Sequence, residues 1–120
     1  MSKKILVIDD EKNIGELIQL ALNVRGYQVQ YSTTGAGGII LFNEFQPDIA
    51  LVDLTKPDMD GMEVARQIKH TDRGKDMPII LMTGRVVSDK EMNTGLFAGV
   101  LEKPFNMATL GSTIEKFLKI

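Results

Sequence analysis

Residues 49–62 read IALVDLTKPDMDGM, in which the apolar run Ile49–Val52 leads into Asp53, a turn rich in Asp, Pro and Gly, and a helical pattern. Apolar runs of the same kind lie at Ile5–Ile8 and Ile79–Met82, and Val and Ile are frequent in them. Continuous runs are typical of strands that helices cover on both faces, whereas half-exposed strands alternate apolar and polar residues. The three runs therefore predict strands of a parallel sheet.

Weaker apolar runs and stretches with helical spacing fill the gaps between these strands. The weaker runs are Val29–Tyr31 and Val100–Leu101. Apolar residues recur at helical spacing, which predicts helices, within residues 14–25, 39–45, 62–69 and 110–118. Gly26 is placed to end the first of these helices, Asn106 is placed to cap the last, and the glycine-rich residues 35–38 weaken the start of the second.

Residues 84–99 have the least regular pattern. Ser88 is a plausible helix cap, Met92, Leu96 and Phe97 would form an apolar face, and Gly95 interrupts it. With a helix in this stretch, five strands alternate with five helices. Because each parallel crossover needs its helix and is right-handed, this alternation predicts a doubly wound α/β fold, with the sheet between two helical layers.

Length and composition restrict the class of protein. The 120 residues, 43% hydrophobic, fit one globular domain over residues 1–120. Fourteen basic and sixteen acidic residues give a net charge of −2, with no basic excess to hold nucleic acid or an anionic membrane. The absence of cysteine excludes disulfides, thiolate zinc sites and a thiol nucleophile, and it suits a reducing compartment. No apolar stretch approaches the ~20 residues of a membrane span or the ~7–15 of a signal-peptide core. We expect a cytoplasmic domain with no direct nucleic-acid or membrane binding.

Polar residues follow the predicted strands, at the edge where doubly wound sheets bind their ligands. Asp9, Asp10 and Glu11 follow the run Ile5–Ile8, and Asp53 follows Ile49–Val52. Thr83 follows Ile79–Met82, and Glu102 and Lys103 follow Val100–Leu101. Residues far apart in the sequence would therefore converge on one acidic pocket that also holds a hydroxyl and an ammonium group.

The electrostatics of such a pocket favour a bound cation. Two carboxylates ~5 Å apart repel by about 3 kcal/mol at an effective dielectric near 20, and a crowded carboxylate tends to take a proton. A hard divalent cation relieves the repulsion, and Mg²⁺ prefers one or two carboxylates, waters and a phosphate oxygen. The pocket therefore suits phosphoryl transfer, where positioning and charge stabilisation supply most of the catalysis and an aspartate can be the nucleophile.

Each of these residues also has an ordinary interpretation when it is taken alone. Asp9 and Asp10 could form a turn and a helix cap, Asp53 could be a loop residue, Thr83 a strand-end hydroxyl, and Lys103 a solvated side chain. Their joint occurrence at four strand ends makes coincidence improbable. The seven methionines are interpreted as core and loop residues and not as a metal site.

The motifs ILVIDDE, LVDLTKPDMDGMEV, IILMTG and LEKPF occur in this order along the whole chain. In this set the sequence resembles a response-regulator receiver domain of bacterial two-component signalling. The resemblance implies the flavodoxin-like doubly wound sheet with strand order 2-1-3-4-5. It also implies a switch that accepts a phosphoryl group from a sensor histidine kinase or phosphotransfer protein and controls an output domain or effector protein. Such a switch catalyses only its own phosphorylation and dephosphorylation.

The resemblance assigns the acidic residues to a phosphoacceptor and a magnesium site. Asp53 matches the phosphoacceptor, which also contributes to the metal site. Asp10 matches the direct Mg²⁺ ligand, and Asp9 the acidic neighbour that usually binds the ion through water. The backbone carbonyl of Thr55 matches the third protein ligand.

The remaining residues of the motifs match groups that contact the new phosphate. Thr83 matches the hydroxyl that turns toward it, Lys103 the ammonium that pairs with it, and Pro104 the proline, often cis, that holds this lysine. Val100 departs from the family, which usually has Tyr or Phe there as the rotamer switch that reports phosphorylation. Either another residue reports the state or the conformational response is small. Arg85, two residues after Thr83, is predicted to affect the lifetime of the phosphate.

Three other functions stay open as alternatives. An aspartate-nucleophile phosphohydrolase would usually carry an Asp-x-Asp pair after the first strand and a cap insertion, for which 120 residues leave no room. A flavin or nucleotide binder needs a Gly- or Ser/Thr-rich loop where this chain has an acidic one. The presence of Asp53, Thr83 and Lys103 argues against a phosphorylation-independent interaction module, whereas Val100 in place of the usual aromatic residue is compatible with one. Both a stand-alone receiver and part of a longer regulator fit the sequence.

Overall fold

Five parallel strands form the central sheet of the computed structural model, which describes residues 2–54, 60–84 and 87–118. The strands are β1 (Lys4–Ile8), β2 (Gln28–Ser32), β3 (Ile49–Asp53), β4 (Ile79–Thr83) and β5 (Gly99–Glu102). Their order is β2-β1-β3-β4-β5, which confirms the predicted sheet and its strand order. The winding direction reverses between β1 and β3, so the carboxyl end of these two strands is where this fold binds ligands.

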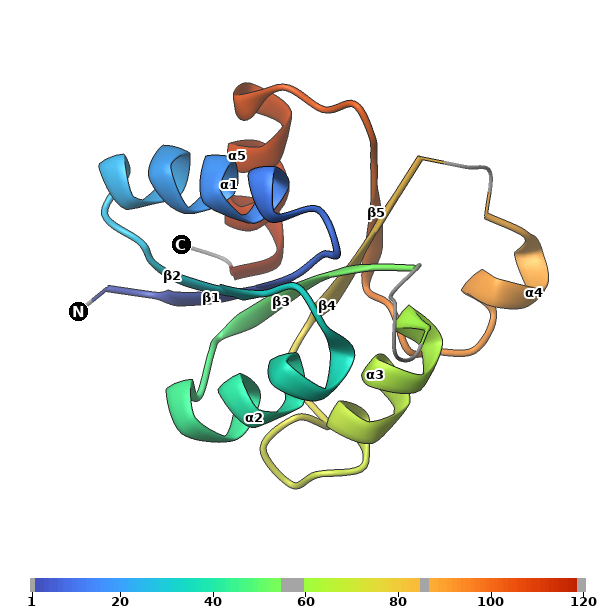
Figure 1. The fold of residues 1–120 in the computed structure, drawn as a ribbon. Coiled ribbons are helices and arrows are strands. Elements are labelled where there is room, and N and C mark those ends of the chain that lie inside the picture. Colours follow the sequence, from blue (N-terminus) through green and yellow to red (C-terminus); the bar gives the residue numbers. More distant parts are fainter. Residues whose placement is uncertain (1, 55–59, 85–86, 119–120) are drawn as a thin grey trace.

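Helices cover both faces of the sheet. They are α1 (Lys12–Val24), α2 (Gly35–Phe45), α3 (Gly61–Lys69), α4 (Asp89–Met92) and α5 (Met107–Leu118). Figure 1 shows α1 and α5 on one face and α2 and α3 on the other. None of the helices within the described ranges has the length and apolar content that a membrane span requires.

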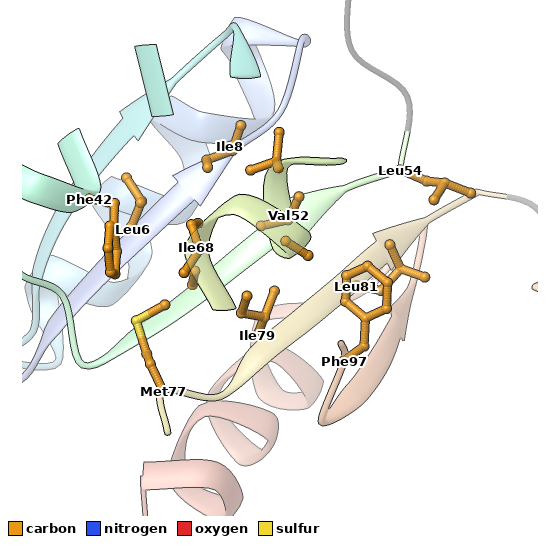
Figure 2. Packing of buried hydrophobic residues seen from close by; sticks show 13 residues of the cluster. Leu6, Ile8, Phe42, Val52, Leu54, Ile68, Met77, Ile79, Leu81 and Phe97 are labelled. Atoms are coloured by element: carbon orange, nitrogen blue, oxygen red, sulfur yellow. The ribbon is translucent and has the colours of Figure 1, made fainter. Parts of the chain in front are cut away.

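Neighbouring residues of one strand point into two separate hydrophobic clusters. Leu6 and Ile8 of β1 pack with residues of α2 and α3, whereas Ile5 and Val7 of the same strand pack with residues of α1 and α5. Figure 2 shows the first cluster, which Phe42 enters from α2. Each large side chain that is fully buried in this way stabilises the fold by about 1.5–3 kcal/mol. The two-sided core explains why the strands read as continuous apolar runs.

The helix ends agree with the predicted signals, except that α2 begins earlier than predicted. Gly26 follows the C-cap of α1 with a φ of +94°, a conformation that favours glycine. The Thr34 side chain accepts a hydrogen bond from the backbone N–H of Gly37 and caps α2, which begins at Gly35 and not near residue 39. A Cβ atom on Gly38 would lie 2.4 Å from Cδ1 of Ile8, so this glycine lets α2 approach the sheet closely.

In the stretch with the least regular pattern, the described residues 87–99 form one helical turn, α4. Ser88 caps it as predicted: Glu91 N donates to Ser88 Oγ at 3.1 Å, and Ser88 N donates to Glu91 Oε1 at 3.0 Å. Phe97 is buried in the cluster on the α3 side. At the last helix, Thr109 N donates to Asn106 Oδ1 at 2.7 Å, which confirms Asn106 as the cap of α5.

Candidate functional site

The polar residues predicted to converge lie at the carboxyl ends of β1, β3, β4 and β5. Asp53 and Thr83 are the last residues of their strands, one position further than the apolar runs indicated. They stay in the strands because the sheet pairing continues there: Asp53 is in register with Met82, and Thr83 with Glu102. Asp53 and Thr83 are buried, with 8% and 2% of their surface exposed.

Asp9 is the most deeply buried acidic group of the site, with 1% of its surface exposed. Its backbone N–H donates to the carbonyl of Ser32 at 3.1 Å, which fixes the residue beside the end of β2. Its side-chain Oδ1 accepts a hydrogen bond from the backbone N–H of Glu11 at 2.9 Å. These contacts leave the other carboxylate oxygen, Oδ2, directed at Lys103.

Lys103 places its ammonium among three carboxylates. Its Nζ atom lies 2.6 Å from Oδ2 of Asp9, 3.7 Å from Oδ2 of Asp53 and 3.7 Å from Oε1 of Glu11. Its backbone N–H donates to the carbonyl of Thr83 at 2.7 Å, which holds β5 against β4. The peptide bond between Lys103 and Pro104 is cis, in agreement with the expectation from the family resemblance.

The charge state of Lys103 follows from these neighbours. Burial by itself lowers the pKa of its amine, but the close contact with Asp9 and the charges of Asp53 and Glu11 together outweigh burial, so the pKa is raised above its ordinary value of 10.5. Lys103 is therefore a cation throughout the physiological pH range.

Three carboxylates form a cluster with the spacing of a metal site. Asp9, Asp10 and Asp53 each offer one oxygen, and these oxygens lie within 4.8 Å of one another. Apart from its ion pair with Lys103, Oδ2 of Asp9 is buried without a hydrogen-bond partner in the part of the chain that the structure describes. Hard oxygen donors at this spacing fit Mg²⁺, which binds a few carboxylates and keeps several waters. Two residues with predicted roles, Thr55 and Arg85, lie outside the described residues.

Two residues to which the sequence assigned no role belong to the site. Glu11 contacts Lys103, as described above; the sequence placed it among the strand-end residues of the pocket but gave it no individual role. Gly61 lies against the strand that carries Asp53, and its N–H donates to the carbonyl of Leu54 at 2.6 Å. The Asp-Gly pair at 60–61 was the available signal, but turns commonly contain it. Glu102, which also ends a strand, is exposed and is not part of the carboxylate cluster.

A cleft of about 470 Å³ adjoins the site between α1 and the segment that follows β5. Ile14 and Leu17 of α1 and Phe105 supply apolar walls, and Glu11 and Lys103 also line the cleft. The cleft therefore places an apolar surface directly beside the charged groups.

Comparison with known proteins identifies the family. The model of the response regulator receiver domain matches residues 5–115, so the chain belongs to this family of two-component signalling domains. Response regulator MprA of Mycobacterium bovis (strain BCG / Pasteur 1173P2) is 34% identical over 122 residues, which cover 99% of this chain and 52% of MprA. The chain thus spans about half the length of the curated relatives it matches.

Solved structures agree with the family assignment. Chemotaxis response regulator CheY4 of Vibrio cholerae superposes with a TM-score of 0.91 at 25% identity, covering 98% of this chain and 99% of that one. The receiver domain of sensor histidine kinase PA1611 from Pseudomonas aeruginosa PAO1 was solved with a magnesium ion coordinated in its active-site cleft. It superposes with a TM-score of 0.89 at 24% identity and full coverage of both chains, a likeness that shows the shared fold.

Proposed function

We propose that residues 1–120 form one receiver domain that accepts a phosphoryl group on Asp53 in a Mg²⁺-dependent reaction. The observation that carries this proposal is the position of Lys103, whose ammonium lies 3.7 Å from Oδ2 of Asp53 and 2.6 Å from Oδ2 of Asp9. A cation at this point stabilises the negative charge that phosphorylation adds to Asp53.

In the proposed reaction, a carboxylate oxygen of Asp53 attacks the phosphorus of a phosphohistidine. The new O–P bond forms as the P–N bond breaks, and the imidazole nitrogen leaves with the electron pair and takes a proton from solvent. The Thr83 hydroxyl donates a hydrogen bond to a phosphoryl oxygen, and the Lys103 ammonium pairs with another. Such groups act by positioning and charge stabilisation and need no further covalent chemistry.

The proposed metal ligands are Asp10 directly, Asp9 through water, Asp53, and the backbone carbonyl of Thr55, a residue outside the described ranges. The spacing of the Asp9, Asp10 and Asp53 oxygens supports this assignment. When bound, Mg²⁺ supplies positive charge to the phosphoryl oxygens and offsets the repulsion among the carboxylates. The PA1611 receiver, which shares the fold, holds magnesium in its active-site cleft.

We further propose a sensor histidine kinase or a phosphotransfer protein as the phosphoryl donor. The apolar cleft beside Lys103 supports this, because it lets a helical partner dock next to Asp53. An output domain or an effector protein would read the result in the cytoplasm. The balance of charge, −2 over the chain, favours protein partners over nucleic acid for this domain.

A phosphorylation-independent interaction module is the second candidate, and Val100 is the observation that favours it. Val100 lies on β5 with 37% of its surface exposed, at the position where the family usually has an aromatic switch. This candidate predicts partner binding that is the same before and after phosphorylation.

Binding of beryllofluoride, a phosphoryl analogue, tests the leading proposal and is followed by fluorine NMR. The parent should give a bound signal that requires Mg²⁺, and Asp53→Asn should give none. A bound signal of equal intensity in Asp53→Asn, or in a metal-free parent, would overturn the proposal.

A further inference from the structure

Lys103 contacts two kinds of carboxylate at once. Asp9 and Asp53 belong to the carboxylate cluster, whereas Glu11 does not. The side chain of Asp9 is fully buried, but that of Glu11 is 64% exposed and lies at the cleft, so only Glu11 has room to move toward the ammonium. This difference matters if the cluster binds a metal ion, and the inference below rests on that proposed magnesium site.

The ammonium of Lys103 and a divalent cation bound in the cluster would compete for the carboxylate of Asp9. Lys103 Nζ lies 2.6 Å from Oδ2 of Asp9, the buried oxygen that has no other polar partner among the described residues. A cation bound among Asp9, Asp10 and Asp53 would repel the ammonium and draw on the same carboxylate. The ammonium must then weaken its pairing with Asp9 without leaving the neighbourhood of Asp53.

We propose that Glu11 is a positioning residue that holds the Lys103 ammonium when Mg²⁺ occupies the aspartate cluster. Oε1 of Glu11 already lies 3.7 Å from Nζ, so a small displacement converts this contact into a close ion pair. The backbone N–H of Glu11 meanwhile donates a hydrogen bond to Oδ1 of Asp9. The backbone of Glu11 therefore fixes Asp9, while its side chain binds the ammonium that Asp9 releases. Glu11 thereby raises the affinity for Mg²⁺ and keeps Lys103 directed at Asp53.

The negative charge of Glu11 could by itself raise the affinity for Mg²⁺, and this general electrostatic effect must be separated from the ion pair with Lys103. Any carboxylate near the cluster raises its affinity for a cation, whether or not Lys103 moves. Glu102 provides the matched control, because it directly precedes Lys103, is exposed, and is not among the charges that raise the pKa of Lys103. Glu102→Gln removes the same charge as Glu11→Gln but leaves the ion pair intact.

The test is a double-mutant cycle of Glu11→Gln and Lys103→Met, with Mg²⁺ affinity measured by isothermal titration calorimetry at fixed ionic strength. Glu11→Gln should weaken Mg²⁺ binding about two- to fivefold, in the range of a partly exposed ion pair. Lys103→Met should strengthen binding because it removes the competing ammonium. In the Lys103→Met background, Glu11→Gln should have no larger effect than Glu102→Gln has in the parent. An equal loss from Glu11→Gln in both backgrounds would overturn the inference.

The position of the ammonium supplies a second readout that does not depend on Lys103→Met folding. The side-chain NMR resonances of Lys103 should shift when Mg²⁺ is added to the parent, and the shift should differ in Glu11→Gln but not in Glu102→Gln. Identical Mg²⁺-induced shifts in all three proteins would contradict the inference alone. A parent that binds no Mg²⁺ would instead overturn the proposed magnesium site, and the inference with it.

Discussion

Gly61 lies directly against the backbone of Asp53: a Cβ atom at residue 61 would be 2.3 Å from the carbonyl oxygen of Asp53 and 2.9 Å from Cα of Leu54. Backbone atoms cannot move aside as the end of a flexible side chain can. The absence of a side chain at the start of α3 is therefore a condition for the position of the candidate phosphoacceptor.

Gly61→Ala is expected to lower the free energy of unfolding by about 1–3 kcal/mol, as overpacking of a rigid site does. It should also slow phosphate incorporation from acetyl phosphate, since the strand end that carries Asp53 must shift. Gly111→Ala is the matched control, because the atoms nearest to the new Cβ belong to the far end of the Arg25 side chain, which can move aside. Urea denaturation and labelling rates check both variants, and equal effects of the two substitutions would refute the role of Gly61.

The ion pairs of Lys103 predict a dependence of stability on pH. The folded-state pKa of Lys103 is raised above 10.5, so its contribution to stability is complete below the ordinary pKa and is lost as the pH rises through the folded value. Lys103→Met should therefore be less stable than the parent by about 1–3 kcal/mol at pH 8 in metal-free buffer, because Asp9 loses its cation. The difference should narrow toward pH 11. A difference that stays constant over this range, in chemical denaturation experiments, would argue against the ion pair.

Asp10 is exposed and belongs to the carboxylate cluster, so its substitution separates metal binding from folding. Asp10→Asn should stabilise the metal-free protein by about 0.5–2 kcal/mol, because it relieves charge repulsion, and should weaken Mg²⁺ binding at least tenfold. Mg²⁺ should accordingly raise the melting temperature of the parent but hardly that of Asp10→Asn. Asp72→Asn, an exposed substitution in the α3–β4 loop, is the control and should behave as the parent does.

The buried Thr83 ends β4, one residue beyond the register partner of Asp53. Thr83→Ala should still incorporate phosphate on Asp53, but the phosphorylation-dependent NMR shift changes in α4 and β5 should be lost. Thr83→Ser keeps the hydroxyl and should restore them. If Thr83→Ala responds as strongly as the parent, another group reads the phosphate.

The fold and the location of the site could be predicted because they depend on local signals. Continuous apolar runs specified the strands, and the residue after each run specified which side chains share an edge. The structure places oxygens of Asp9, Asp10 and Asp53 within 4.8 Å, as that argument predicts, whereas their chemical roles remain predictions.

Features that depend on contacts between distant elements could not be predicted. The glycines at the start of α2 suggested a weak helix end. In the structure, Gly38 packs against the side chain of Ile8 and leaves no room for a Cβ atom. The sequence predicts that Glu11 and Lys103 lie at the same edge of the sheet, but their direct contact depends on how the segments after β1 and β5 approach each other, which no local pattern indicates. The single turn of α4 ends at Met92, before Gly95. The sequence indicated that Gly95 interrupts the helical pattern, but it did not predict the positive φ of +77° at this residue.

Phosphorylation of Asp53 is best tested by mass spectrometry of the intact protein after incubation with acetyl phosphate and Mg²⁺. Asp60→Asn is the matched control for Asp53→Asn, since Asp60 caps α3 through Glu63 N and asparagine caps equally well. We expect one added phosphoryl group in the parent and in Asp60→Asn, and none in Asp53→Asn or in the parent without Mg²⁺. Labelling of Asp53→Asn at the parental level would contradict it.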